Sequence, residues 1–475
     1  MSNLIPSYPA TSVHPWDTAE HWNWQTWLAL LVLGAASLFS GNNSGAALLF
    51  WATVYVAMVV SDWRLMTFAL VSASFLFEAT RLENGSISVT EVVIAVVALR
   101  IIWAKGPVNL IKESFPPDLQ DGLLLGMFGL ILLSVIWVLA GHGENAAALK
   151  SLGRYVEYAI AYLCLSRLLS EPAELKELEF FLSLVAAVLA LVGIYQHFLG
   201  PQASAQSFPW GADVTLNADA DSFRIYSVFS NPIFLSAFCG FFVPFTLDRV
   251  IRRDEPHRFT YAVCFALVSA ALLLTSSRTG MLGAAVGLFV LAGKNIKKIA
   301  ALAIGVVIVI GLFSTKSLED RLLQTGSSAD LTGAIRLLKY YRTALVILEH
   351  PIAGVGTGEY QTYFLAEIAP DLPKEGYGEL TAENTFLQIG AELGVPGLML
   401  YCVLVITILA RAYRLRKADV AGGRGLFAGV CAFTVSSLFV SMTAVSAVLL
   451  MLILYLLVKR NHEFFYSQDT AESAA

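Results

Sequence analysis

Residues 121–140 read DGLLLGMFGLILLSVIWVLA and carry a single charged side chain, that of Asp121. About 20 predominantly apolar residues suffice to cross the hydrocarbon core of a bilayer as an α-helix. Because the bilayer core offers no water to unpaired backbone groups, such a run must be a helix rather than an open strand. The stretch therefore predicts a transmembrane helix.

Comparable runs recur along the 475 residues, of which 57% are hydrophobic and only 14% charged. A soluble domain carries roughly 25% charged residues, and the mean hydropathy here is +0.67. The length rule gives about fourteen candidate spans, near residues 24–41, 45–61, 64–79, 88–103, 121–140, 153–170, 176–199, 226–248, 259–275, 278–293, 297–314, 385–410, 424–441 and 443–459. The expected fold is an all-α polytopic membrane protein with about 12–14 transmembrane helices.

The short basic loops set the expected orientation. They cover residues 105–112, 249–258, 294–298, 411–424 and 459–460. Cytoplasmic loops carry an excess of Lys and Arg, and placing all of these loops in the cytoplasm agrees with strict alternation of the spans. Both termini are then cytoplasmic. The segment through Asn23 lacks the basic start and cleavage site of a signal peptide and is expected to be a retained tail.

Composition also narrows the partners and cofactors. The net charge of −5 indicates no nucleic-acid partner. The five cysteines lie inside apolar runs without a CxxC pair, so neither a zinc site nor a disulfide framework is expected. We predict no cofactor. Asp219-Ala220-Asp221 matches the short DxD metal motif of many glycosyltransferases, but so short a pattern arises easily by chance and no metal site is assigned to it.

Two long loops face outward in this topology, residues 200–225 and a larger one that ends near Asn384. Loops of this length are usually functional or disordered. Within the second, residues 333–350 show helical spacing, with an apolar stripe of Leu337, Tyr341, Ala344, Leu345 and Leu348. Arg336, Lys339, Tyr340 and Thr343 share another face. We expect an amphipathic helix near the outer membrane boundary, with a basic side.

Several basic residues contradict the charge rule because they lie at outer ends of spans or in outer loops: Arg81, Lys150, Arg154, Arg224, Arg278, Arg336, Lys339 and Arg342. A single such residue usually reaches for lipid headgroups without further role, and this explains Arg81, Lys150 or Lys339 taken alone. Arg224 and Arg278 flank tight turns rich in small polar residues, and arginine suits two-pronged phosphate binding. Asn231-Pro232, which follows Arg224, should open or bend its helix.

Glu383 precedes Asn384, a plausible N-cap where the large loop re-enters the membrane. The carboxylate either helps to cap the helix or acts as a general base beside the arginines. Glu78 and Glu157 are weaker acidic candidates, or buried partners of Arg81 and Arg154. The glycine-rich residues 354–358 predict a tight turn, whose backbone amides could also hold an anion.

Short motifs follow one another around the large loop: Arg224 with Phe229-Ser230-Asn231-Pro232, then Ser277-Arg278-Thr279-Gly280, Arg336 with Tyr340, HPIAGVG at 350–356, and ENTFLQ at 383–388 with ELG at 392–394. In order and spacing they resemble the O-antigen ligase and polymerase superfamily. That group contains lipid A-core:O-antigen ligases, Wzy-type polysaccharide polymerases and some protein O-oligosaccharyltransferases.

The resemblance implies a GT-C-like membrane glycosyltransferase in the bacterial inner membrane, inverting and metal-independent, with its active site on the periplasmic side. Its donor is a glycan on undecaprenyl diphosphate, and its acceptor is a glycan or a lipid. Other polysaccharide export proteins are further candidate partners. The implied catalytic residues are Arg224, Arg278 and Glu383. The implied substrate-binding residues are Arg336, Tyr340, Asn384, Arg154 and Arg81.

The expected organisation follows from the spans and the motifs. Residues 1–23 form a cytoplasmic tail and 24–225 the N-terminal helices with outer loop 200–225. Residues 226–410 form the ligase- or polymerase-like core with periplasmic loop 315–384, followed by C-terminal helices at 411–459 and a cytoplasmic tail at 460–475. Many ligases have His-Asn where this chain has Glu383-Asn384, and the expected span count exceeds the twelve typical of ligases. Both departures favour a polymerase over a ligase or protein O-oligosaccharyltransferase.

Two other function classes stay open. A transporter or flippase for a lipid-linked sugar would bind a similar anion, but transporters usually place ionisable residues near the midplane, with repeats in two halves. A non-catalytic scaffold of an export complex would tolerate loss of charge at Arg224, Arg278 and Glu383.

Overall fold

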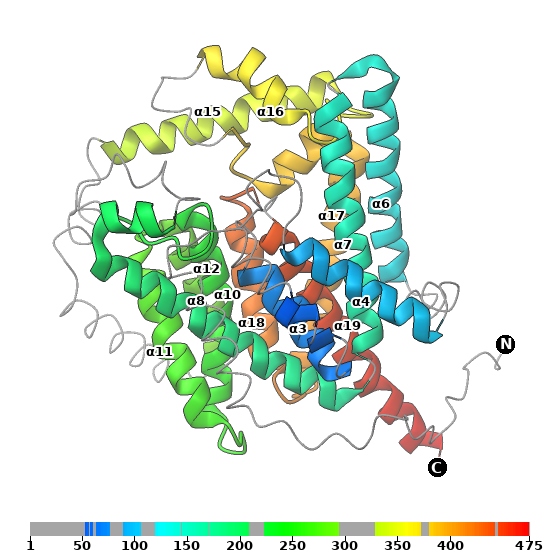
Figure 1. Cartoon of the computed structure of the whole chain (residues 1–475), viewed down its shortest axis with the longest axis vertical. Coiled ribbons are helices and arrows are strands. Elements are labelled where there is room, and N and C mark those ends of the chain that lie inside the picture. The colour runs from blue at the N-terminus through cyan, green and yellow to red at the C-terminus, as the bar shows by residue number, and fades with distance from the viewer. Residues whose placement is uncertain are drawn as a thin grey trace.

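The computed structural model describes residues 53–56, 58–59, 63–76, 89–105, 119–143, 145–169, 171–208, 223–293, 328–371, 380–441 and 445–474. Within these ranges every regular element is helical, as the sequence predicts (Figure 1). The N-terminal helices are α3 (Trp63–Leu76), α4 (Val89–Lys105), α6 (Leu119–Trp137), α7 (Asn145–Leu168) and α8 (Pro172–Ser207). The later ones are α10 (Pro232–Ile251), α11 (Arg258–Leu274), α12 (Arg278–Ala292), α15 (Ser328–Glu349), α16 (Tyr360–Tyr363), α17 (Thr385–Lys417), α18 (Gly423–Ser437) and α19 (Val445–Ala474).

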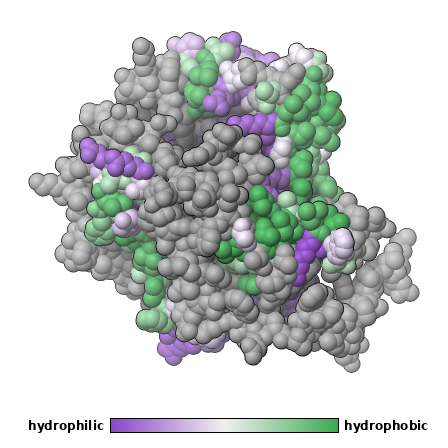
Figure 2. Space-filling view, viewed as in Figure 1, coloured by the Kyte–Doolittle hydropathy of each residue, from purple (hydrophilic) through white to green (hydrophobic). Residues whose placement is uncertain are grey.

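Four of the described helices are long and apolar enough to cross a membrane: Asp121–Gly141, Pro172–Ser207, Pro232–Ile251 and Thr385–Lys417. Shorter apolar helices occupy Leu65–Phe75, Arg258–Leu274 and Arg278–Ala292. On α6, Leu132, Leu133 and Ile136 are exposed, and apolar surface covers the upper right of the molecule, where α6 and α7 lie (Figure 2). Exposed apolar side chains along a long helix are what contact with lipid requires. The chain is an all-α polytopic membrane protein.

Several expected boundaries need correction. The expected span 226–248 begins only at Pro232, with Asn231 as its N-cap, because proline has no N–H to lose at the first helical position. The first part of the expected loop 200–225 is helical, since α8 continues to Ser207 across a kink at Gly200. The expected spans 24–41 and 297–314, and most of 45–61, lie outside the described residues.

The packing of α12 explains why it contains so many glycines. A Cβ on Gly280 would lie 2.3 Å from the Ser236 carbonyl oxygen of α10, and one on Gly283 would lie 2.6 Å from the Ala432 oxygen of α18. Small residues allow membrane helices to approach backbone to backbone. This contact fixes α12, and therefore Arg278 at its first position, against α10 and α18.

Basic loops gather at one end of the bundle. Arg252 of loop 249–258 donates to the Val420 carbonyl at 3.3 Å. Arg249 pairs with Glu179, which also accepts from Asn461, next to the basic pair at 459–460. The described loops 249–258 and 411–424 and the residues that follow the last span therefore share an end, while α15 and α16 lie across the opposite one (Figure 1).

Buried ion pairs tie the helices together at this basic end. Lys459 of α19 lies 2.7 Å from Asp121 of α6, with side chains only 1% and 2% exposed. The Tyr162 hydroxyl of α7 donates to the same carboxylate at 3.0 Å. The consecutive helices α6 and α7 thus meet the distant α19 at one buried carboxylate.

Candidate functional site

The site is built on a break in α17. Gly394 has φ 70° and ψ −170°, so the helix bends there and its first part, residues 385–393, takes its own direction. The loop after α15 supports the bend. Val355 N donates to Ala391 O (2.8 Å), and Val395 N donates to Pro351 O (2.8 Å). The motifs HPIAGVG and ELG are therefore two sides of one backbone contact.

This contact corrects one expectation. The amides of residues 354–358 were candidates to hold an anion, but Val355 N and Gly356 N donate to carbonyls of α17. Thr357 N donates to Ser134 Oγ of α6 at 2.8 Å. These donors are committed to holding the helix, so the glycine-rich turn is structural.

Asn384 caps α17 and fastens it to the end of α18. Its Oδ1 accepts from Leu387 N at 3.0 Å, which confirms the expected N-cap. Its Nδ2 donates to Leu438 O at 2.9 Å. Thr385 Oγ1 donates to Val440 O at 2.7 Å. Asn384 is therefore held on both sides of its amide.

Glu383 lies directly before this cap, and two cations of α15 hold its carboxylate. Arg336 Nε donates to Oε2 at 2.8 Å, and Lys339 Nζ donates to Oε1 at 2.8 Å. The Tyr340 hydroxyl lies 3.1 Å from both Glu383 O and Leu438 O. Glu383 itself has φ +50°, which few residues other than glycine adopt. The structure thus brings together Glu383, Arg336, Tyr340 and Asn384, four of the residues singled out from the sequence.

The charges of this cluster do not cancel. Arg336 and Lys339 contribute two positive charges against one negative charge on Glu383. Burial works to raise the pKa of Glu383, but the attraction and hydrogen bonds of Lys339 and Arg336 prevail and lower it. Burial raises the pKa of Tyr340 to about 12. At neutral pH the site therefore holds a carboxylate, a protonated phenol and an excess of positive charge.

Lys339 is the main residue that sequence reasoning misjudged. Taken alone it was explained by snorkelling to lipid headgroups, yet its side chain is 1% exposed. Its ammonium group also lies 5.3 Å from the centre of the Phe364 ring. The signal was present in the helical spacing, since Lys339 shares the polar face of the expected helix with Arg336 and Tyr340. That face points into the protein, whereas Leu337 and Leu348 of the apolar stripe are exposed.

Gln388, the last residue of the ENTFLQ motif, is a second residue to which the sequence assigned no role of its own. Its Oε1 accepts from Ala382 N at 3.0 Å, and its Nε2 donates to Glu392 Oε1 at 2.7 Å. It therefore fixes the backbone immediately before Glu383 from one turn inside α17.

Arg224 contacts the turn that precedes Arg278, called here the Arg224–Arg278 turn. Arg224 Nε donates to Thr275 O at 2.8 Å, three residues before Arg278. Arg278 begins α12 and is exposed. Ser277 Oγ and Ser236 Oγ are joined at 2.8 Å, which fastens this turn to α10. Arg224 therefore contacts the turn from which Arg278 begins α12.

The Arg224–Arg278 turn and the Glu383 cluster occupy the same end of the bundle. Five residues beyond Arg278, a Cβ on Gly283 would meet the Ser436 hydroxyl of α18. Two residues after Ser436, the Leu438 carbonyl accepts from Tyr340 and Asn384. The connection between the two groups runs through α12 and α18.

Of the remaining candidates for substrate binding, Arg154 lies within the described residues. Arg154 is part of α7. Its neighbour Tyr155 interacts electrostatically with both Glu392 and Arg154. The contacts described for Arg154 do not include Glu383. Arg81, Glu78 and the Asp219-Ala220-Asp221 motif fall outside the described residues.

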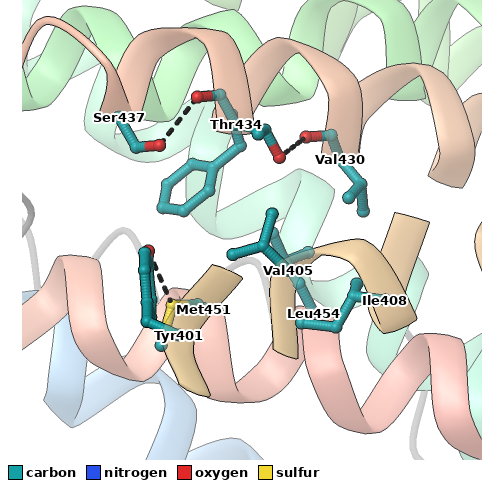
Figure 3. Close-up of a pocket in the computed structure, with 9 residues that line it drawn as sticks. Tyr401, Val405, Ile408, Val430, Thr434, Ser437, Met451 and Leu454 are labelled. Atoms are coloured by element: carbon teal, nitrogen blue, oxygen red, sulfur yellow. Dashed lines mark hydrogen bonds between the residues drawn. The ribbon is translucent and has the colours of Figure 1, made fainter. Parts of the chain in front are cut away.

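An apolar cavity lies among α17, α18 and α19 (Figure 3). Its lining includes Tyr401, Val405, Phe433 and Ser437. It adjoins the polar cluster, because Ser437 precedes Leu438 and the Tyr401 ring packs edge-on against Phe386, 5.1 Å between centres. Polar groups at the bundle end thus lie next to apolar space inside the bundle.

Residues 263–402 match the family model described as O-Antigen ligase. The matched segment contains Arg278, Arg336, Lys339 and Glu383, whereas Arg224 precedes it. A comparison with curated proteins finds no match. The order of the motifs and the polytopic helical fold agree with this match, which supports membership of the O-antigen ligase and Wzy-type family over residues 263–402.

Proposed function

We propose that this protein is a Wzy-type polysaccharide polymerase, which transfers glycan repeat units from undecaprenyl diphosphate at the periplasmic face of the bacterial inner membrane. The observation that carries the proposal is the Arg336–Lys339–Glu383 cluster, an excess of positive charge at the end opposite the basic loops. The family match supports a reaction of the ligase or polymerase type.

In the proposed reaction the acceptor hydroxyl attacks the anomeric carbon of the donor with inversion. The bond from that carbon to the diphosphate oxygen breaks, and undecaprenyl diphosphate leaves with the electron pair. Arg224 and Arg278 bind the diphosphate, and Arg336 with Tyr340 binds the glycan or the diphosphate. Fixed guanidinium groups stabilise charge that develops on a leaving group, so the mechanism needs no metal ion.

Glu383 receives the proton of the acceptor hydroxyl. It is ionised in the structure, because its pKa is lowered, and an ionised carboxylate is the form that accepts a proton. A positioned base contributes about 10²–10⁴-fold to such a transfer. The site thereby divides the work between cations for the leaving group and a carboxylate for the nucleophile.

A ligase that attaches finished chains to lipid A-core is the second candidate, because the matching family model carries the ligase description. The surface glycan of a deletion strain separates the two. A polymerase predicts loss of long chains while single repeat units stay attached to their acceptor. A ligase predicts complete loss from the acceptor, with polymer accumulating on the carrier.

Replacing Arg278 tests the proposed chemistry in cells. We expect Arg278→Ala to reduce polymer output at least about tenfold, because removing one fixed donor from a developing oxyanion commonly costs 10²–10³-fold. Arg253→Ala is the matched control, since Arg253 is exposed at the basic end. Both variants are compared at equal membrane levels. Full polymer output from Arg278→Ala would reject the proposal.

Reconstitution distinguishes an enzyme from a transporter. The purified protein is placed in vesicles with a lipid-linked oligosaccharide and no other protein. Longer glycan products mean transfer. Flipped but unchanged donor means transport, and would reject the proposed function.

A further inference from the structure

The two cations that hold Glu383 differ in their surroundings. The Lys339 side chain is 1% exposed and the Arg336 side chain is 25% exposed, although both lie 2.8 Å from the same carboxylate. The hydrogen bond from Arg336 to Glu383 uses only its Nε, and a guanidinium has five N–H donors. One cation is therefore buried on Glu383, while the other still offers donors to a ligand.

We propose that Lys339 is a positioning residue that keeps Glu383 in place through a permanent buried ion pair, and that Arg336 is an exchangeable partner which passes from Glu383 to the diphosphate of the donor. The inference rests on the proposed function. In it, Glu383 and the donor diphosphate compete for Arg336. Until the donor binds, the Glu383 carboxylate takes the place of the diphosphate beside Arg336.

The charge balance favours this exchange. If the diphosphate took Arg336 and no other cation were present, Glu383 would be left as an uncompensated, largely buried carboxylate, which is strongly unfavourable. Lys339 prevents that, because the Lys339–Glu383 pair persists after Arg336 has moved. A diphosphate also offers arginine the two-pronged geometry that the present Nε contact does not use.

The exchange has a chemical consequence. With two cations beside it, Glu383 binds a proton weakly, because each positive charge favours the ionised form. When Arg336 moves to the diphosphate, one of these charges is neutralised, and Glu383 binds the acceptor proton more readily. The base is thus strengthened only when a donor is present.

The test measures binding of farnesyl diphosphate to the purified full-length protein in detergent, at constant pH and salt. Glu383→Gln should bind the probe about tenfold more tightly than wild type, because the competing carboxylate is gone and its repulsion of the diphosphate disappears. The same variant should lose polymer output, because it lacks the proposed base. Tighter binding with lost turnover is a result that a merely structural role does not produce.

Lys339→Met should bind the probe about tenfold more weakly, because Arg336 then remains as the one described cation that pairs with Glu383. The double variant Lys339→Met with Glu383→Gln should recover binding to at least the wild-type level, since no carboxylate remains to compete. Lys150→Met, at an exposed lysine on α7, is the matched control and should bind as wild type does.

The outcomes distinguish a failure of the proposed function from a failure of the Arg336 exchange. Wild type that does not bind farnesyl diphosphate contradicts the proposed function. If wild type binds the probe but Glu383→Gln binds it equally or more weakly, the exchange is overturned. The same conclusion follows if Lys339→Met has the affinity of wild type. Thermal unfolding of each variant identifies a misfolded one, and if Lys339→Met fails to fold, Glu383→Gln and the double variant still decide.

Discussion

The bend in α17 gives the sharpest prediction about how the fold supports the site. Gly394 combines φ 70° with ψ −170°, a backbone region that is essentially restricted to glycine. A Cβ there would lie 2.7 Å from the carbonyl carbon and oxygen of Ile352 and from the Pro351 oxygen. These atoms are backbone and cannot rotate away. Gly394→Ala therefore forces either a strained residue or a separation of α17 from the loop before it.

The magnitude follows from two contributions. A non-glycine residue held in this backbone region costs roughly 1–3 kcal/mol. Overpacking a close contact costs roughly another 1–3 kcal/mol. We expect Gly394→Ala to lower the free energy of unfolding by about 2–6 kcal/mol in total. Because Val395 N and Val355 N bond across this contact, the variant should also displace the Glu383 turn and reduce polymer output.

Gly129→Ala is the matched control, because a Cβ at that position of α6 meets nothing within 4 Å. Alanine at a helical position should leave stability unchanged or raise it by up to about 1 kcal/mol. The assay is equilibrium unfolding of the detergent-solubilised protein, followed by circular dichroism, beside polymer output in a deletion strain. If the two glycine variants were equally stable and equally active, the assigned role of the bend would be refuted.

Two further predictions concern charges. Lys459→Met should lower the free energy of unfolding by about 3–5 kcal/mol, because it leaves the buried Asp121 carboxylate without its cation. The control Lys176→Met, at an exposed lysine, should leave it unchanged. Equal unfolding curves for the two variants would contradict the predicted cost. Glu383→Gln should lower the free energy of unfolding most at pH values above 4.5, the ordinary glutamate pKa. The pKa of Glu383 is lower in the folded protein than in the unfolded chain, so its carboxylate stabilises the fold above the unfolded-state pKa. That stabilisation is lost as the pH falls through the folded-state pKa. When unfolding is measured from neutral pH to pH 3, the difference in free energy of unfolding between wild type and variant should shrink below pH 4.5. A difference that grows there would contradict the stabilising ion pair.

Features that depend on nearby residues were predictable. Asn384 caps α17 because its side chain reaches an amide three residues away, and the polar face of α15 follows from helical spacing alone. The association of Arg224 with Arg278 was implied only by the resemblance, since they lie 54 positions apart and Arg224 reaches the turn before Arg278 through the Thr275 carbonyl.

The ion-pair partner of Lys339 was not predictable from the residues around it in sequence. In sequence it is one more basic residue near a membrane boundary, and its partner Glu383 is 44 positions away. The same holds for the pair of Lys459 and Asp121, 338 positions apart. A sequence reveals that such charges exist, but the identity of a partner depends on which helices become neighbours.

The stretch at 121–140 and the runs like it determined by themselves that this protein is helical and lies in a membrane, because crossing a bilayer depends only on local length, apolarity and backbone hydrogen bonding. The tertiary structure alone decided that α15 turns its basic face onto Glu383, that α17 breaks at Gly394, and that the glycine-rich turn supports a helix instead of binding an anion. Each of these depends on contacts between segments far apart in the chain, and a carboxylate is a base, a cap or a counter-ion according to what those contacts place beside it.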